Sequence, residues 1–292
     1  MELKLLFVCN EGFIFGIFAL GIFLSFQWLK FPDLTPDGSF VLGPCVFIKS
    51  CLSGVPLFWA ALLGISSGFA LGIITASFNK FLKIPAIIAG LITSTATYSL
   101  GWLILDKPNQ PLNGSGEFFS YNMTTNSVLL CVVLLLLLAV ILFLFNLFGS
   151  SIWGLKLRAL GENEKIAKGI HIRPWSYYII TLGVSNALVA LSGILFIQRS
   201  YSVDINMGTG QTIIGLIAMI FGVLITANSH KIYMTTTFII LGAILYKLII
   251  QVTLELGFPA ESFRLISAFL IVTLFFVMKK FDTTFLDKLK WS

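Results

Sequence analysis

Charged residues are scarce in this sequence. Only 11% of its 292 residues are Asp, Glu, Lys or Arg, whereas 57% are hydrophobic. Soluble globular proteins carry about 25% charged residues, since ionic groups must cover their surface. The scarcity of charge therefore excludes a soluble globule and predicts an integral membrane protein.

Residues that bind metals or form disulfides are also few. The chain has four cysteines and two histidines, which are Cys9, Cys45, Cys51, Cys131, His171 and His230. Their spacing matches no zinc-ligand pattern. We therefore expect no metal site, no cofactor and no disulfide framework. Cys45 and Cys51 would pair only if both faced an oxidising compartment.

The common catalytic motifs are missing as well. A P-loop needs a lysine and a hydroxyl after its second glycine, because these groups hold the phosphates and the magnesium ion. The nearest approach, GSSIWGLK from Gly149, has a leucine where the lysine should be. Neither a histidine–glutamate metal motif nor a Gly-x-Ser-x-Gly elbow occurs. We predict that the chain is not an enzyme and does not itself hydrolyse ATP.

Long apolar runs are what the sequence has in abundance. A membrane helix needs roughly 20 apolar residues, and such runs cover residues 5–29, 55–78, 84–105, 124–148, 175–198, 209–227, 232–254 and 262–278, with a shorter run at 38–53. The alternation of a membrane β-barrel is absent. We predict an all-α integral membrane protein, a polytopic bundle of about eight to ten transmembrane helices. It forms a single domain, residues 1–292, with discontinuous helices near 31–40 and 201–211.

Basic residues are concentrated in particular connections. They gather in segment 149–174 and in the tail 279–292, whereas connection 105–123 has one lysine against two acidic residues. By the positive-inside rule the basic segments are cytoplasmic and 105–123 is external. The net charge of +6 is thus explained by loop asymmetry, and no nucleic-acid partner is expected. Apolar residues recur every four positions in the tail, which predicts an amphipathic helix on the inner membrane surface.

The cytoplasmic loop contains a candidate helix. Acidic residues open the stretch Glu162–Lys168 and basic residues close it, an order that complements the helix dipole. Gly169 is placed to adopt the left-handed conformation at its end, with Ile170 as the hydrophobic contact of the cap. A helix of about two turns is unstable alone in water, so it needs a docking surface. The alternative is a solvated loop that only obeys charge rules.

Three stretches carry a family resemblance. The run LRALGENEKIAKGI, Leu157–Ile170, resembles the cytoplasmic coupling loop of permease subunits in bacterial ABC importers. The branch it resembles includes the branched-chain amino acid and ribose permeases. The stretch LKFPDLTPDGSF, Leu29–Phe40, is similar to a signature of the tryptophan/tyrosine permease subgroup, and Ser185–Leu216 adds a third match.

The resemblance implies a multi-pass half-transporter of the bacterial inner membrane. It implies a homodimer with a second permease copy, separate cytoplasmic ABC ATPase subunits and an external substrate-binding protein. The implied substrate is a small solute, an amino acid, with an aromatic one as a candidate. The implied ATPase-coupling residues are Ala159, Leu160, Gly161, Glu162, Asn163, Ile166, Ala167, Gly169 and Ile170. The alternative, an ion-coupled secondary transporter without an ATPase, stays open.

Two polar interruptions indicate a substrate pathway. Irregular backbone at membrane depth is tolerated only against protein or a water-filled cavity, and paired interruptions in two halves of a transporter point to its substrate site. The candidate residues are Asp33, Thr35, Asp37 and Ser39 in the first interruption and Asp204, Asn206, Thr209 and Gln211 in the second. The alternatives are a turn in which Asp33 or Asp37 caps the next helix, and an external loop at the second.

A further polar stripe lies in the run 232–254 and just beyond it. Lys247, Gln251 and Glu255 share one helix face. They either line a cavity, or Lys247 and Glu255 pair while the lysine extends towards the outer interface.

Overall fold

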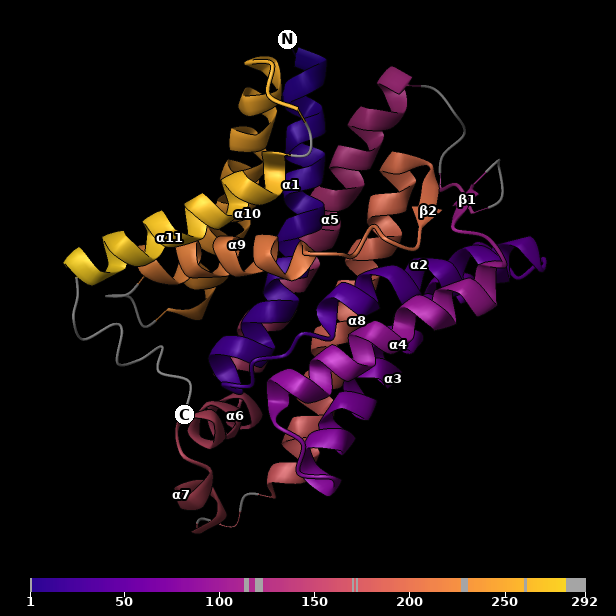
Figure 1. Ribbon diagram of the computed structural model, residues 1–292. Coiled ribbons are helices and arrows are strands. Elements are labelled where there is room, and N and C mark those ends of the chain that lie inside the picture. Colours follow the sequence, from indigo (N-terminus) through magenta and orange to yellow (C-terminus); the bar gives the residue numbers. More distant parts are fainter. Residues whose placement is uncertain are drawn as a thin grey trace. The chain divides into compact units, whose positions relative to one another are not determined.

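The computed structural model describes residues 2–112, 116–118, 123–169, 171, 173–226, 231–259 and 262–281 (Figure 1). The described chain is almost entirely helical. Its helices are α1 (Glu2–Phe23), the π-helix η1 (Leu24–Trp28), α2 (Pro36–Leu52), α3 (Leu57–Phe81), α4 (Ala86–Leu105), α5 (Met123–Ser150), α6 (Ile152–Glu162), α7 (Glu164–Gly169), α8 (Pro174–Ser200), α9 (Gln211–Ile225), α10 (Ile232–Glu255) and α11 (Phe263–Phe281). Two short strands, β1 (Asn109–Pro111) and β2 (Ser202–Asp204), pair antiparallel.

The helices coincide with the apolar runs of the sequence. Six are long and apolar enough to cross a membrane: Leu6–Trp28, Leu57–Phe81, Ala86–Leu105, Val128–Ser150, Pro174–Ser200 and Ile232–Glu255. Gln211–Ile225 and Phe263–Phe276 are apolar but shorter. The predicted all-helical, polytopic membrane protein is confirmed. The full count of spans stays a prediction.

The described residues divide into two compact units. One contains the chain up to Leu20, Ser127–Ser151 and the described residues from Ile213 onward, and the other contains Gly21–Asn126 and Ile152–Thr212. We call the first the α10 unit and the second the α2 unit, and each is described by itself. The amphipathic tail predicted at 279–292 lies largely outside the described residues.

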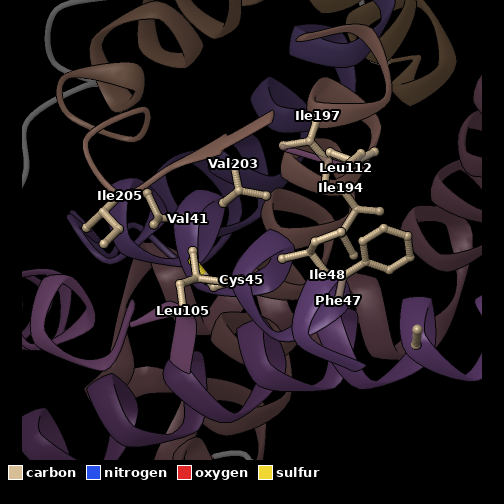
Figure 2. Packing of buried hydrophobic residues seen from close by; sticks show 11 residues of the cluster. Val41, Cys45, Phe47, Ile48, Leu105, Leu112, Ile194, Ile197, Val203 and Ile205 are labelled. Atoms are coloured by element: carbon tan, nitrogen blue, oxygen red, sulfur yellow. The ribbon is translucent and has the colours of Figure 1, made fainter. Parts of the chain in front are cut away.

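Helix α2 is the core of the α2 unit. It begins at Pro36, a residue whose fixed φ suits the first position of a helix, and it packs against α3, α4 and α8. Apolar side chains of α2 such as Phe47 and Ile48 are fully buried, in one cluster with Ile194 of α8 and Val203 of β2 (Figure 2). The short helix expected at 38–53 is therefore surrounded by protein.

Helices α3 and α8 approach each other backbone to backbone. Gly64, Gly68 and Gly72 recur every four residues along α3 and form one face of it. A Cβ atom built on Gly68 would lie 2.5 Å from the carbonyl oxygen of Asn186, and one on Gly72 would collide with the carbonyl oxygen of Leu182. Only glycine fits these positions, because any side chain would force the two helices apart.

The α10 unit holds an ion pair between α1 and α10. The Lys247 ammonium nitrogen lies 3.2 Å from a Glu11 carboxylate oxygen and 3.8 Å from the centroid of the Phe15 ring. The sequence did not suggest this partner for Lys247, and the two alternatives, a cavity-lining stripe and a Lys247–Glu255 pair, stay predictions. Glu255 accepts a hydrogen bond of 3.2 Å from the Gln251 amide nitrogen.

Candidate functional site

The first interruption folds into a buried polar cluster. After η1 the chain leaves the helix, passes through Lys30 with a φ of 52°, and enters α2 at Pro36. Asp33, within this connection, has no exposed surface. One of its carboxylate oxygens accepts a hydrogen bond of 2.8 Å from the Thr35 backbone nitrogen, and the other accepts one of 2.8 Å from the Asn186 amide nitrogen of α8.

Ser39 and three threonines extend this cluster. The Ser39 hydroxyl donates to the Asn186 amide oxygen over 2.7 Å. The Thr35 and Thr75 hydroxyls lie 2.7 Å apart, and the Thr75 and Thr93 hydroxyls 2.6 Å apart. This row of hydroxyls connects the interruption to α3 and α4. Asp33, Thr35 and Ser39 are thus enclosed by protein in this conformation, and their role in a pathway stays a prediction.

Asp37 joins the first interruption to the second. Its carboxylate accepts hydrogen bonds from the Gly210 backbone nitrogen (2.9 Å), the Thr212 backbone nitrogen (2.7 Å) and the Thr212 hydroxyl (2.6 Å). These donors belong to the first turn of α9 and the residue before it, so Asp37 acts as the N-terminal cap of α9. The sequence left two roles open for Asp37, lining a pathway and capping the next helix. The helix that it caps begins far along the chain, and its role in a pathway stays a prediction.

The close contact between α2 and the second interruption depends on a glycine. A Cβ atom on Gly208 would collide with the carbonyl oxygen of Asp37. The interrupted segments at 31–40 and 201–211 are therefore in direct contact. The sequence linked them only as similar interruptions in the two halves of the chain.

The other candidates of the second interruption stay local to it. The Asp204 carboxylate accepts a hydrogen bond of 2.7 Å from the Asn206 backbone nitrogen, which closes a tight turn. Asn206 and Thr209 are exposed. The Gln211 amide nitrogen donates to the carbonyl oxygen of Met207 over 2.8 Å. A pathway role for these four residues stays a prediction.

The segment predicted to be the cytoplasmic loop forms two helices where the sequence predicted one. Glu162 ends α6, and α7 begins at Glu164. Asn163 separates them and caps α7, because its side-chain oxygen accepts hydrogen bonds from the Lys165 backbone nitrogen (3.0 Å) and the Ile166 backbone nitrogen (3.1 Å). The predicted single helix Glu162–Lys168 is wrong because asparagine at this position terminates one helix and starts the next.

The predicted end of this helix is also shifted. Gly169 is the last residue of α7, and the left-handed conformation occurs at His171, with a φ of 60°. The prediction that Gly169 adopts this conformation is wrong, since the helix continues through it. Ile170, the predicted cap contact, lies outside the described residues.

The predicted coupling residues divide into inward-facing and outward-facing groups. Leu160 and Ala167 are 2% and 1% exposed, so they already pack within the chain. Gly161 lies so close to the carbonyl oxygen of Trp28 that a Cβ atom would collide with it. Ile166, in contrast, is 66% exposed. The remaining outward-facing members of the set are Ala159, Glu162, Asn163 and Gly169.

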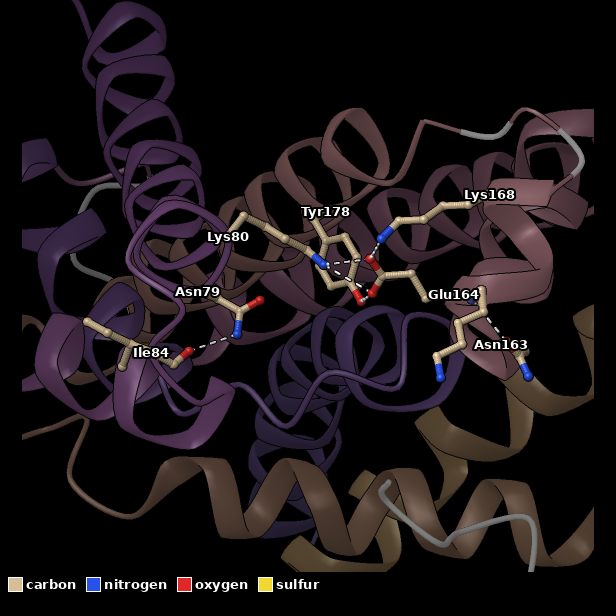
Figure 3. A network of polar contacts seen from close by, with 8 residues as sticks. Asn79, Lys80, Ile84, Asn163, Glu164, Lys168 and Tyr178 are labelled. Carbon is tan, nitrogen blue, oxygen red and sulfur yellow. Dashed lines mark hydrogen bonds and ion pairs between the residues drawn. The ribbon is translucent and has the colours of Figure 1, made fainter.

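Glu164 connects α7 to two long helices (Figure 3). Its carboxylate oxygens lie 3.2 and 3.3 Å from the Lys80 ammonium of α3, and the Tyr178 hydroxyl of α8 donates to it over 3.3 Å. Lys168, one turn along α7, lies 3.0 Å away. Partial burial opposes ionisation of Glu164, but the hydrogen bonds and charges of Lys168 and Lys80 prevail, so the pKa of this carboxyl is lowered from its ordinary value.

The sequence matches a known family over nearly its whole length. Residues 4–278 match the family described as "Branched-chain amino acid transport system / permease component". The chain belongs to this permease family. Membership decides between the two predicted functions in favour of the ABC permease. The role of α6 and α7 as a coupling loop stays a prediction.

Two relatives of the permease cover most of its length. It is 30% identical over 266 residues to the "Tyrosine transport system permease protein" of Clostridioides difficile (strain R20291), a match covering 91% of this chain and 88% of the relative. It is also 30% identical over 250 residues to "Uncharacterized protein RP368" of Rickettsia prowazekii (strain Madrid E), covering 85% and 88%.

A solved structure shares the fold of the permease. It is an ABC transporter described as metal-chelate type, in an inward-facing conformation, with a TM-score of 0.53 and 18% sequence identity. The match covers 94% of this chain and 84% of that chain. At this identity the likeness shows the fold alone.

Proposed function

We propose that the permease forms the translocation pathway of an ABC importer for an amino acid, with tyrosine as the first candidate. Two copies pair in the bacterial inner membrane, separate cytoplasmic ATPase subunits drive the cycle, and an external binding protein delivers the substrate. The name of the C. difficile relative, a tyrosine transport system permease protein, supports the substrate class, at 30% identity over 91% of this chain.

The observation that carries the proposal is the outer face of α7. The helix has six residues, too few to be stable without neighbours, yet it presents Ile166 with 66% of its surface exposed. Lys165 and Lys168 flank this isoleucine and are exposed. Ile166 with its two flanking lysines would fit a groove that has an apolar floor and acidic edges. We assign such a groove to the ATPase subunit.

Docking is tested with two variants of Ile166. Burial of an isoleucine contributes about 1.5 to 3 kcal/mol, so Ile166→Asp should weaken ATPase binding by about tenfold or more. Ile166→Met keeps an apolar side chain of similar volume and is the matched control. The measurement is copurification of the ATPase together with substrate-stimulated ATP hydrolysis in proteoliposomes. Full binding and full stimulation in the Asp variant would exclude α7 as the docking element.

The substrate is tested with the complete reconstituted transporter. Proteoliposomes containing the permease, its ATPase and its binding protein should accumulate radiolabelled tyrosine in an ATP-dependent manner. Unlabelled tryptophan and phenylalanine should compete more strongly than leucine, and ribose should not compete. Uptake of ribose with no uptake of any amino acid would overturn the proposed substrate class.

A further inference from the structure

We infer that Glu164 is the residue through which movement of α7 reaches the membrane helices. This inference rests on the proposed function, since it needs an ATPase docked on α7. It adds a positioning residue that acts inside the permease, behind the docking surface.

The geometry places Glu164 on the permease side of α7. Its side chain is 33% exposed, whereas Ile166, two residues later, is 66% exposed. The two side chains therefore divide the helix into a face turned to the chain and a face open to a partner. Ala167, at 1% exposure, adds an apolar contact on the inner face.

The contacts of Glu164 reach two helices at once. Lys80 lies in the last turn of α3 and Tyr178 in the second turn of α8. Lys80 also lies 3.6 Å from the centroid of the Tyr178 ring, so the two partners contact each other as well as the carboxylate (Figure 3). Displacement of α7 would therefore act on α3 and α8 together.

This arrangement differs from an exposed ion pair of the same unit. The Asp106 carboxylate lies 3.3 Å from the Lys49 ammonium, but these side chains are 76% and 47% exposed. A pair so exposed contributes little. Asp106 is not among the predicted coupling residues, so it is a control for the loss of a carboxylate that pairs with a lysine.

The test compares Glu164→Gln with Asp106→Asn in proteoliposomes that contain the ATPase and the binding protein. Glu164→Gln should keep ATPase copurification at the wild-type level and lower substrate uptake per ATP hydrolysed by roughly twofold to fivefold, the factor expected for a partly exposed ion pair. Asp106→Asn should leave the ratio unchanged. A wild-type ratio in Glu164→Gln would overturn the inference while leaving ATPase docking intact.

A second variant distinguishes transmission of movement through Glu164 from a loss of folded structure. Tyr178→Phe removes only the hydroxyl that donates to Glu164 and keeps the ring beside Lys80. It should lower the ratio by a smaller factor, and the double variant Glu164→Ala/Tyr178→Phe should be no worse than Glu164→Ala alone, because alanine already removes the acceptor of the Tyr178 hydroxyl. Additive losses would show independent effects and overturn the inference. If the wild-type permease retains no ATPase, the proposed function itself fails, and the inference fails with it.

Discussion

The cap that Asp37 provides to α9 gives the sharpest test of the fold. Asp37→Ala removes the acceptor of three hydrogen bonds, from the Gly210 and Thr212 backbone nitrogens and the Thr212 hydroxyl. Loss of an N-cap side chain costs about 0.5 to 2 kcal/mol, and a partly buried charge at a helix N-terminus contributes up to about 2 kcal/mol. These two figures describe overlapping effects, so we expect about 2 kcal/mol for Asp37→Ala.

The loss should be local and measurable by hydrogen exchange. About 2 kcal/mol corresponds to an increase of roughly 30-fold in the local opening constant, so the amides of Gly210 and Thr212 should exchange that much faster in detergent-solubilised Asp37→Ala. Asp37→Asn keeps an acceptor of the same shape and should show a smaller increase. Asp204→Asn alters a carboxylate of the same connection that contacts only its own turn, and it should leave both amides unchanged.

Uptake measurements distinguish the capping role of Asp37 from a role of its charge in the substrate pathway. We expect Asp37→Asn to express and dimerise at the wild-type level and to lower uptake. If the amides of Gly210 and Thr212 exchange at wild-type rates in Asp37→Ala, the start of α9 does not depend on Asp37 and the reasoning fails. If Asp37→Asn disappears from the membrane, the residue serves folding and not transport.

Two further predictions concern ionised side chains. Lys247→Met removes the ammonium group that lies 3.2 Å from the Glu11 carboxylate and should lower stability by about 1 to 3 kcal/mol. Lys247→Met/Glu11→Gln should recover most of that loss in thermal denaturation, and an equally unstable double variant would argue against the pair. The pKa of Glu164 is lowered in the folded state, so its ion pairs should stabilise α7 above the ordinary glutamate range and be lost as the pH falls through that lowered pKa. Amide exchange of α7, corrected for its intrinsic pH dependence, should therefore rise at acid pH in the wild type and show no such step in Glu164→Gln.

Helix positions were predictable because the membrane imposes a length on apolar runs. Each predicted run coincides with a helix, and the break near 31–40 follows from Pro32 and Pro36, which cannot donate to a helical ladder. The boundary between α6 and α7 was missed although Asn163 carried the signal. Asparagine is among the strongest N-cap residues, and it stands directly before Glu164.

The polar contacts between distant segments were not predictable from the sequence. Asn186, Thr75 and Thr93 are three among several polar residues of mostly apolar helices, and which of these residues meet depends on how each helix is rotated about its axis. The partners of Lys80 and Lys247 are equally remote in sequence. A pattern in one segment cannot specify such contacts, since they arise only after the helices have packed.

The glycine face of α3 limits how the transporter can move. Gly68 and Gly72 bring α3 so close to α8 that a shift along the axis would push side chains into the carbonyl oxygens of Asn186 and Leu182. Sliding or rolling of one helix against the other is therefore sterically opposed. We expect the two helices to move together as one rigid body during transport, and the bending that opens or closes a pathway to occur elsewhere in the chain.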